Sequence, residues 1–330
     1  MVWRLLALPQ GFQVACAALG FGWGGIVFSL SWRLWWQAAR PHTLPLAAAS
    51  VLLAALPAWQ QQRFQWPLFA AMLCTALLLQ IFANLANDYG DARHGADHAR
   101  SDRLCGSGRL GRPAMRRALL CCGALCVASG AILLFVSGVA GWQAGWPWWL
   151  AGALSLAAAW HYTAGSRPYG YRGGGEAAVW LFFGLLAVCG GSLLYGCPLS
   201  WPLWTAANAQ GLWCAAVLNI NNLRDLDSDR AAGKYTVAVH LGRQRAVAYH
   251  AVLLGAAAVC WTAWLFHSLP FAAALMATAL LWPVSAGAWL ALRRAARQDG
   301  RPVFHRLLAG FGRWILLWAT GLAGVVWLVS

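Results

Sequence analysis

The chain has 330 residues, of which 61% are hydrophobic and only 10% are charged, so its composition excludes an ordinary soluble globular protein. The net charge is +15 and comes almost entirely from arginine, because Lys234 is the only lysine. Such a balance could indicate nucleic acid or acidic lipid, but the basic residues gather in alternate loops, as they do in polytopic membrane proteins. We therefore predict an integral membrane protein that does not bind nucleic acid.

The N-terminal stretch is apolar and rich in glycine. We interpret residues 1–37 as an extension, either an interfacial helix or a poorly ordered segment, because a further full span would break the charge alternation of the loops. Its last part, Trp32-Arg33-Leu34-Trp35-Trp36, has the aromatic and basic side chains typical of the lipid headgroup level. The membrane domain is expected over residues 38–330, and Pro41 and Pro45 suit the start of its first helix.

Nine apolar segments follow, each close to the 20 or so residues that an α-helix needs to cross a bilayer. Periodicity adds little to their assignment, because helices surrounded by lipid or by other helices are apolar on every side. We predict an all-α polytopic membrane protein with about nine transmembrane helices. The predicted spans are residues 44–60, 66–88, 117–137, 146–163, 176–195, 202–222, 248–267, 270–291 and 309–329.

The basic residues mark one side of this predicted membrane domain. Loops 89–117, 164–175, 223–247 and 292–308 hold 19 of the 24 basic residues, whereas the intervening loops hold only Arg63. Because positively charged loops stay in the cytoplasm, we predict that the N-terminus and these four loops are cytoplasmic. Compact spans without a transit segment favour a bacterial cytoplasmic (inner) membrane.

The nine acidic residues are concentrated in two places. The first cluster runs from Asn84 through Asn87, Asp88 and Asp91, with Asp97 and Asp102 after it, at the end of the second span. The second runs from Asn221 and Asn222 through Asp225, Asp227 and Asp229, at the end of the sixth span. Only Glu176 and Asp299 lie elsewhere. Because both clusters fall on the predicted cytoplasmic side, we expect them to act together.

Each cluster has its carboxylates at helical spacing. Asp88 and Asp91 are three residues apart and Asp225 and Asp229 are four apart, so each pair shares one helix face. Two facing pairs would crowd four carboxylates, which is favourable only with cations between them. Carboxylate and amide oxygens favour Mg²⁺, or Mn²⁺, over zinc. We predict these four aspartates as metal ligands; the other interpretation is a set of loop residues and solvated helix caps.

A divalent metal beside arginine-rich loops indicates a diphosphate substrate, because Mg²⁺ completes its shell with phosphate oxygens and arginine suits bidentate phosphate contacts. Its location among lipid-facing helices indicates an apolar tail, and hence a polyprenyl diphosphate. The metal and the basic side chains would stabilise the leaving diphosphate, and apolar walls would shield the allylic carbocation from water. A cation transporter is the alternative class, and it would place carboxylates near the bilayer midplane on broken helices.

A third polar stretch follows the fourth span and contains Tyr162, Arg167, Tyr169 and Tyr171. Arg167 could hold a diphosphate or an acidic aromatic co-substrate, although an interfacial aromatic-basic loop is an equal interpretation. Glu176 opens the fifth span.

Over about residues 38 to 325 these motifs resemble those of the UbiA-type intramembrane aromatic prenyltransferases. The resemblance is carried by Arg40-Pro41-His42-Thr43-Leu44-Pro45, by both Asn/Asp clusters and by Arg167-Pro168-Tyr169-Gly170-Tyr171. The first and last of these motifs are most similar to the branch that prenylates 1,4-dihydroxy-2-naphthoate in menaquinone biosynthesis. The sequence departs from the pattern at Glu176, where aspartate is expected, and at Cys105-Gly106, where relatives tend to have Gly-Pro.

The resemblance implies a nine-helix bundle around a central cavity that opens laterally to lipid. The implied reaction moves a polyprenyl group from its diphosphate to 1,4-dihydroxy-2-naphthoate, with loss of CO₂ and diphosphate, giving demethylmenaquinol. Another acceptor, such as 4-hydroxybenzoate, is the alternative within the family. The implied catalytic residues are Tyr162 and the four metal-binding aspartates. The residues expected to bind substrate are Asn84, Asn87, Arg40, Arg109, Arg167, Asn221, Asn222 and Lys234.

Overall fold

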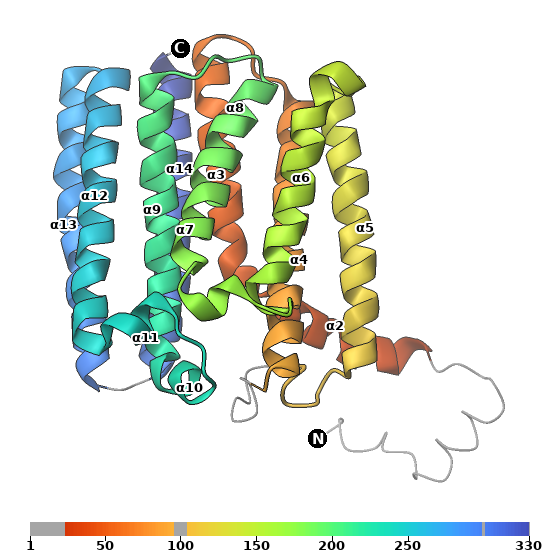
Figure 1. The fold of residues 1–330 in the computed structure, drawn as a ribbon. Helices are drawn as coiled ribbons and strands as arrows, with labels where there is room; N and C mark the ends of the chain where they lie inside the picture. Colours follow the sequence, from red (N-terminus) through yellow and green to blue (C-terminus); the bar gives the residue numbers. More distant parts are fainter. Residues whose placement is uncertain (1–23, 96–103, 299–300, 330) are drawn as a thin grey trace, which may run out of the picture.

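The computed structural model describes residues 24–95, 104–298 and 301–329, and these residues form helices with no strand among them. Nine long helical segments stand side by side as one bundle (Figure 1). The all-α prediction is confirmed, and each predicted span overlaps one of the nine segments. The segments are α3 (Leu44–Gln60), α4 (Trp66–Arg93), α5 (Arg112–Val136), α6 (Trp142–Thr163), the continuous run α7 (Gly175–Val179), η3 (Trp180–Gly190) and α8 (Gly191–Leu194), then α9 (Trp201–Arg224), α12 (Arg243–Ser268), α13 (Phe271–Gln298) and α14 (Arg301–Val329).

Among the described residues, seven stretches are both long enough and apolar enough to cross a membrane, and one of them joins part of α2 to α3. The two segments outside this set are α6 and α9. α6 is rich in tryptophan, and α9 carries five Asn and Gln side chains. Both nevertheless run parallel to the other segments (Figure 1). The chain is a multi-pass membrane protein.

Proline defines the start of several long helices. Pro45, Pro67, Pro113 and Pro202 each lie in the first turn of α3, α4, α5 and α9. At this position the missing N–H costs no hydrogen bond and the fixed φ is already helical. The helices therefore begin where the local sequence dictates.

The arginine-rich loops meet at one end of the bundle, termed the basic end. The short helices η2 (Tyr169–Arg172), α10 (Leu226–Ala231) and α11 (Val237–Leu241) lie there, and α2 (Gly24–Ala39) crosses the bundle at the same end (Figure 1). The chain turns from α2 into η1 (Pro41–Thr43) at Arg40, whose φ of 50° is left-handed. The predicted extension over residues 1–37 stays a prediction, because residues 1–23 lie outside the described chain.

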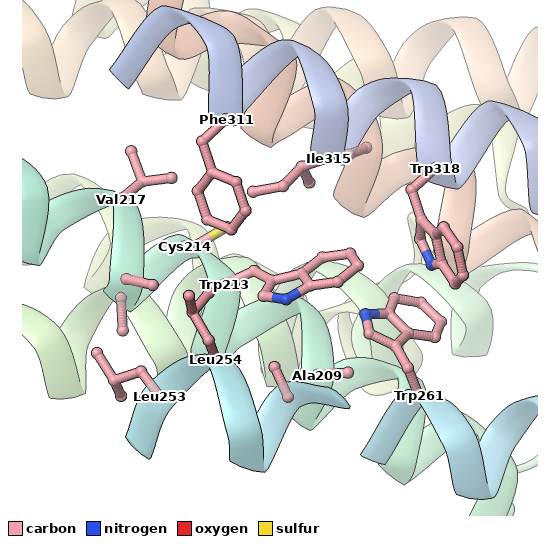
Figure 2. Close-up of a cluster of buried hydrophobic side chains, with 14 of the residues drawn as sticks. Ala209, Trp213, Cys214, Val217, Leu253, Leu254, Trp261, Phe311, Ile315 and Trp318 are labelled. Carbon is pink, nitrogen blue, oxygen red and sulfur yellow. The ribbon is translucent and has the colours of Figure 1, made fainter. Parts of the chain in front are cut away.

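The largest hydrophobic core surrounds α9, which packs against α3, α12, α14 and η3. Trp213 of α9 is fully buried, and its ring centroid lies 5.3 Å from that of Trp261 and 6.0 Å from that of Trp318 (Figure 2). Such aromatic pairs add about 0.5–1.5 kcal/mol each beyond their burial. This packing fixes the position of α9, and with it the second Asn/Asp cluster at its end.

Candidate active site

A cavity of about 550 Å³ runs through the bundle from the basic end. α4 lines it with a helical stripe that runs from Asn87 back to Met72, and α9 lines it with Cys214, Val217 and Asn221. At 1.5 Å per residue, the α4 stripe is about 22 Å long. The spacing of three and four residues places these side chains on one face of each helix. The cavity therefore joins the polar helix ends to the apolar middle of the membrane domain.

Two predicted asparagines hold the turn between α2 and α3 against α4. Asn84 donates to the Thr43 hydroxyl at 2.9 Å and to the Ala39 carbonyl at 2.8 Å. Arg40 donates to the Asn87 side-chain oxygen at 3.0 Å. These bonds point the Arg40 guanidinium at the polar end of the cavity, which Arg40, Asn84 and Asn87 all line. The structure brings these three predicted residues together.

Lys234 joins the two Asn/Asp clusters. Its ammonium lies 3.5 Å from an Asp91 carboxylate oxygen and 3.8 Å from an Asp229 carboxylate oxygen. Its side chain is only 6% exposed and lines the cavity. Tyr171 donates a hydrogen bond to Asp91 at 3.0 Å and places its ring 5.4 Å from the Lys234 ammonium. A buried cation thus offsets two buried carboxylates at the edge of the cavity.

Asp88 is 2% exposed and faces the loop that precedes α5. One of its carboxylate oxygens accepts a hydrogen bond from the Leu104 backbone N–H at 3.3 Å. The other, Oδ1, is buried and accepts no hydrogen bond from any residue that the structure describes. A buried carboxylate oxygen without a partner costs free energy, and a cation at this position would remove that cost.

The second cluster is held by Arg224 and Glu176. Arg224 donates to both carboxylate oxygens of Asp225, at 2.6 and 2.9 Å, and to the Asn221 side-chain oxygen at 2.8 Å. Asn222 is buried and donates to the Glu176 carboxylate at 2.9 Å. Asn221 faces the cavity, whereas Asn222 points to the start of α7. Glu176 stands where the family pattern has aspartate, and through Asn222 it therefore supports the end of α9.

Tyr162 and Tyr169 form an aromatic pair on the cavity wall, with ring centroids 5.5 Å apart. Tyr169 donates to the Ala158 carbonyl at 3.0 Å. Burial raises the pKa of Tyr169 to about 12, so its phenol keeps the proton that makes this bond. The Gly170 and Gly175 backbones approach the Tyr162 ring closely and fix its orientation.

Two predicted diphosphate contacts lie away from the cavity. Arg109 and Arg167 are exposed, and neither lines the cavity. Asp97 and Asp102, which the first cluster includes, fall outside the described residues. The roles of Arg109 and Arg167 stay predictions.

The predicted metal ligands are not gathered into a preformed cage. Among the residues that the structure describes, no group of three or more Asp, Glu, His or Cys side chains is placed to hold a metal ion. The donor set still suits a divalent cation that keeps water and phosphate ligands, because Mg²⁺ usually takes only one or two carboxylates. Oδ1 of Asp88, which accepts no hydrogen bond from the described part of the chain and lies close in sequence to Asp91, is the oxygen best suited to such an ion.

Sequence reasoning assigned no supporting contact to Arg224, Gln80 or Thr43, and it placed Tyr171 in the third polar stretch without its hydrogen bond to Asp91. Gln80 donates to the Thr43 hydroxyl at 3.0 Å, and Arg224 is a cation beside the second cluster. Arg224 had a usable signal, since it directly precedes Asp225 in a chain with few charges. Thr43 lies in a motif that carries the family resemblance, but its pairing with Gln80 depends on tertiary packing and has no signal in the sequence.

Residues 46–308 match the UbiA prenyltransferase family. The chain is 43% identical over 239 residues to the 1,4-dihydroxy-2-naphthoate octaprenyltransferase of Escherichia coli (strain K12), covering 69% of this chain and 75% of that protein. It is 36% identical over 307 residues to the enzyme of the same name from Mycobacterium tuberculosis (strain ATCC 25618 / H37Rv), covering 90% and 97%.

Solved structures share the fold. A UbiA homolog from Archaeoglobus fulgidus, bound to GPP and Mg²⁺, superposes with a TM-score of 0.59 at 14% identity, over 88% of this chain and 99% of that chain. The apo UbiA homolog from Aeropyrum pernix K1 gives a TM-score of 0.55 at 22% identity, over 83% and 96%. The fold and the sequence matches agree, and the chain belongs to the UbiA prenyltransferase family.

Proposed function

We propose that this protein transfers a polyprenyl group from polyprenyl diphosphate to 1,4-dihydroxy-2-naphthoate, releasing CO₂ and diphosphate and forming demethylmenaquinol. The names of its relatives support this acceptor. The single observation that carries the proposal is the continuous cavity, which has Arg40 and Lys234 at one end and apolar walls along the rest. A molecule with an anionic head and a long apolar tail matches that polarity.

The diphosphate lies at the basic end in this proposal. Lys234 and Arg40 line the cavity there and supply positive charge where the leaving group develops negative charge. Asp88, Asp91, Asp225 and Asp229 are the residues that would hold a divalent cation, Mg²⁺ or Mn²⁺. When bound, such a cation neutralises the charge that builds up on the diphosphate as the carbon–oxygen bond breaks. Arg109 and Arg167 would reach the diphosphate only if their loops close over it.

The proposed reaction needs no oxidant or reductant, because each electron pair released by a broken bond is taken up within the same reaction. The allylic carbon–oxygen bond breaks and its electron pair leaves with the diphosphate. The ring carbon that bears the carboxylate attacks the allylic cation and forms the new carbon–carbon bond. The carboxylate then leaves as CO₂, and the electron pair of its bond returns to the ring and restores aromaticity.

The residues around the reacting carbon protect the cation. Tyr162 presents its ring to the cavity, and an aromatic face attracts a neighbouring cation. The apolar walls of α4, α6 and η3 exclude water, which would otherwise capture the cation as an alcohol.

We further propose that the basic end faces the cytoplasm of a bacterial cell, in the inner membrane. The arginine-rich loops support this orientation through the positive-inside rule. A soluble naphthoate and a diphosphate would then both reach the site from the cytoplasm. The carboxylates lie at helix ends and not at mid-helix, which disfavours the transporter alternative.

A competition assay tests the acceptor. Protein purified in lipid nanodiscs would receive octaprenyl diphosphate, Mg²⁺ and equal amounts of 1,4-dihydroxy-2-naphthoate and 4-hydroxybenzoate, with products identified by mass. The proposal predicts a prenylated naphthalene product that lacks the carboxyl group. A product that retains its carboxyl group on the benzoate ring would move the assignment to the other acceptor, and transfer to neither by folded protein would refute prenyl transfer.

A further inference from the structure

A hydrogen-bond network joins η1 to α4 where the polar end of the cavity meets its apolar walls. Its members are Thr43, Gln80 and Asn84, and all three line the cavity. On the lining stripe of α4, Asn84 and Asn87 lie towards the basic end, whereas Leu79 is apolar. Gln80 is two helical turns, or about 10 Å, from Asn87. Gln80 therefore marks the border between the polar and apolar parts of this wall.

Two backbone carbonyls decide which groups of this network donate and which accept, because a carbonyl oxygen can only accept. The Thr43 hydroxyl donates its single proton to the Arg40 carbonyl at 2.9 Å. Asn84 turns its amide nitrogen to the Ala39 carbonyl at 2.8 Å. The side-chain oxygens of Thr43 and Asn84 are then left as acceptors, and the Gln80 amide nitrogen meets them at 3.0 and 3.4 Å. These contacts fix the orientation of the Gln80 amide.

This orientation leaves the amide oxygen of Gln80, Oε1, without a donor. In the described part of the chain no residue donates a hydrogen bond to it, and protein atoms do not enclose it. Because Gln80 lines the cavity, a molecule inside the cavity can reach this oxygen. A ligand that satisfies Oε1 must supply an O–H or N–H group.

Of the two proposed substrates, only the aromatic acceptor supplies such a group. A polyprenyl tail has no hydrogen-bond donor, and a diphosphate bound to a metal ion only accepts. 1,4-Dihydroxy-2-naphthoate has two hydroxyls, but its 1-hydroxyl donates to the neighbouring carboxylate of the same molecule. The 4-hydroxyl is therefore the free donor. The positive charge of Arg40 attracts the carboxylate to the basic end, which directs the 4-hydroxyl along α4 towards Gln80.

We infer that Gln80 is a specificity-determining residue for the acceptor, and that its Oε1 accepts a hydrogen bond from the 4-hydroxyl of the naphthoate. The inference rests on the proposed function for the identity of this ligand. The bond holds the carboxylate-bearing ring carbon towards the diphosphate, where the new carbon–carbon bond forms.

The same contact disfavours other acceptors. A naphthoate without the 4-hydroxyl leaves the Gln80 oxygen unpaired, and sites built to bind a hydroxyl reject analogues that lack it. 4-Hydroxybenzoate could make both polar contacts, but its nucleophilic carbons lie beside the hydroxyl. Binding at Arg40 and Gln80 would therefore hold these carbons away from the diphosphate.

The first test removes the oxygen with Gln80→Met, which keeps the length of the side chain. The readout is the ratio of kcat/KM for 1,4-dihydroxy-2-naphthoate to that for 1-hydroxy-2-naphthoate. We expect this ratio to fall about tenfold, with transfer to 1-hydroxy-2-naphthoate and the KM for octaprenyl diphosphate retained. The control is Thr75→Val on the same stripe, because the Thr75 hydroxyl is already bonded to Ala71 at 2.8 Å and Ser129 at 2.7 Å. The control should keep the wild-type ratio, and a wild-type ratio in folded Gln80→Met would overturn the inference.

The second test uses the wild-type protein and needs no turnover. Calorimetry in nanodiscs, without oxygen, would compare 1-hydroxy-2-naphthoates that carry a hydroxyl, an amino or a methoxy group at position 4. The hydroxyl and amino compounds donate to Gln80 and should bind with similar affinity. The methoxy compound only accepts and should bind at least about tenfold more weakly, a difference that Gln80→Met should remove.

The outcomes separate this inference from the proposed function. Equal binding of the methoxy and hydroxyl compounds by the wild-type protein would overturn the role of Gln80, whether or not the prenyl group is transferred. Binding that depends on a donor at position 4, without any prenyl transfer to 1,4-dihydroxy-2-naphthoate, would instead refute the proposed function and leave the contact with Gln80 supported.

Discussion

Lys234 is the residue at which the two Asn/Asp clusters meet. The sequence predicts it as a diphosphate contact, and the structure adds its contacts with Asp91 and Asp229. The contact with Asp91 spans 143 residues of sequence, so no local pattern could reveal it. Lys234 therefore has two roles in this account, balancing buried carboxylates and facing the substrate cavity.

Lys234→Ala is expected to lower kcat/KM at least about a hundredfold, or about 2.7 kcal/mol of transition-state stabilisation. It should also lower the free energy of unfolding by about 3 kcal/mol, because removal of one partner leaves buried carboxylates uncompensated. Steady-state kinetics and denaturant unfolding in detergent measure the two effects. The control is Arg243→Ala, which breaks an exposed ion pair to Asp227 at 2.7 Å and should cost less than about 1 kcal/mol. Equal losses in both variants would contradict a special role for Lys234.

Asp88→Asn tests the bare carboxylate oxygen. The change keeps the shape of the side chain and removes its charge, so we expect activity to fall about a hundredfold and half-maximal activity to need more Mg²⁺. Asp227→Asn is the matched control, since Asp227 belongs to the second cluster but its side chain is 75% exposed. Titration of activity against Mg²⁺ measures both variants. A normal Mg²⁺ titration in Asp88→Asn would remove Asp88 from the metal-binding set.

At the scale of elements, Gly90 sets the contact between α4 and α6. A Cβ at Gly90 would lie 2.5 Å from backbone atoms of Thr163 and Ala164, while the Thr163 hydroxyl donates to the Ala86 carbonyl at 3.2 Å. This contact positions Asp88 and Asp91 relative to Tyr162 at the end of α6. Backbone atoms cannot move aside as a flexible side chain could.

Gly90→Ala is therefore expected to reduce the unfolding free energy by about 1–3 kcal/mol through overpacking. The midpoint of unfolding in detergent, followed by circular dichroism, measures this loss. Gly255→Ala in α12 is the control, because a Cβ there meets no atom within 4 Å, and replacing glycine within a helix adds up to about 1 kcal/mol. A Gly90→Ala protein as stable as the wild type would show that α4 and α6 are less closely packed.

The helix positions were predictable and their polar ends were not. Hydropathy predicts that the second span ends at residue 88, but α4 continues to Arg93 and carries Asp88 and Asp91 of the first cluster. The second cluster straddles a junction, since α9 ends at Arg224 and Asp225 leads into α10. Hydropathy detects the part of a helix that faces lipid, whereas these polar turns are stabilised by partners from other helices.

The side of the bundle that holds the site was predictable from the whole chain, because acidic clusters and basic loops fall at the same helix ends. The pairing of charges within the site was not. The expectation of metal between facing carboxylates did not foresee Lys234 between Asp91 and Asp229, or Arg224 on Asp225. The sequence shows which charged residues are present, but only the tertiary structure shows which of them are in contact.

At the scale of the whole molecule, the two ends of the bundle should face opposite sides of the membrane. α14 ends at the end opposite to the basic end (Figure 1). Alkaline phosphatase fused after Ser330 is expected to be active in a bacterial host, and green fluorescent protein at that position dark. Fusions after Gly233 should give the reverse pattern. The opposite result at both positions would contradict a cytoplasmic site.

Prenyl transfer with loss of CO₂ is the central claim, and its most direct test follows the carboxyl carbon. The purified protein would receive octaprenyl diphosphate, Mg²⁺ and 1,4-dihydroxy-2-naphthoate labelled at the carboxyl group, and labelled CO₂ and prenylated product would be quantified together. The account predicts equal amounts of CO₂ and product, both abolished by chelation of Mg²⁺ and both strongly reduced in Asp88→Asn. Prenylated product that retains the label, or product formed equally well without a divalent cation, would contradict it.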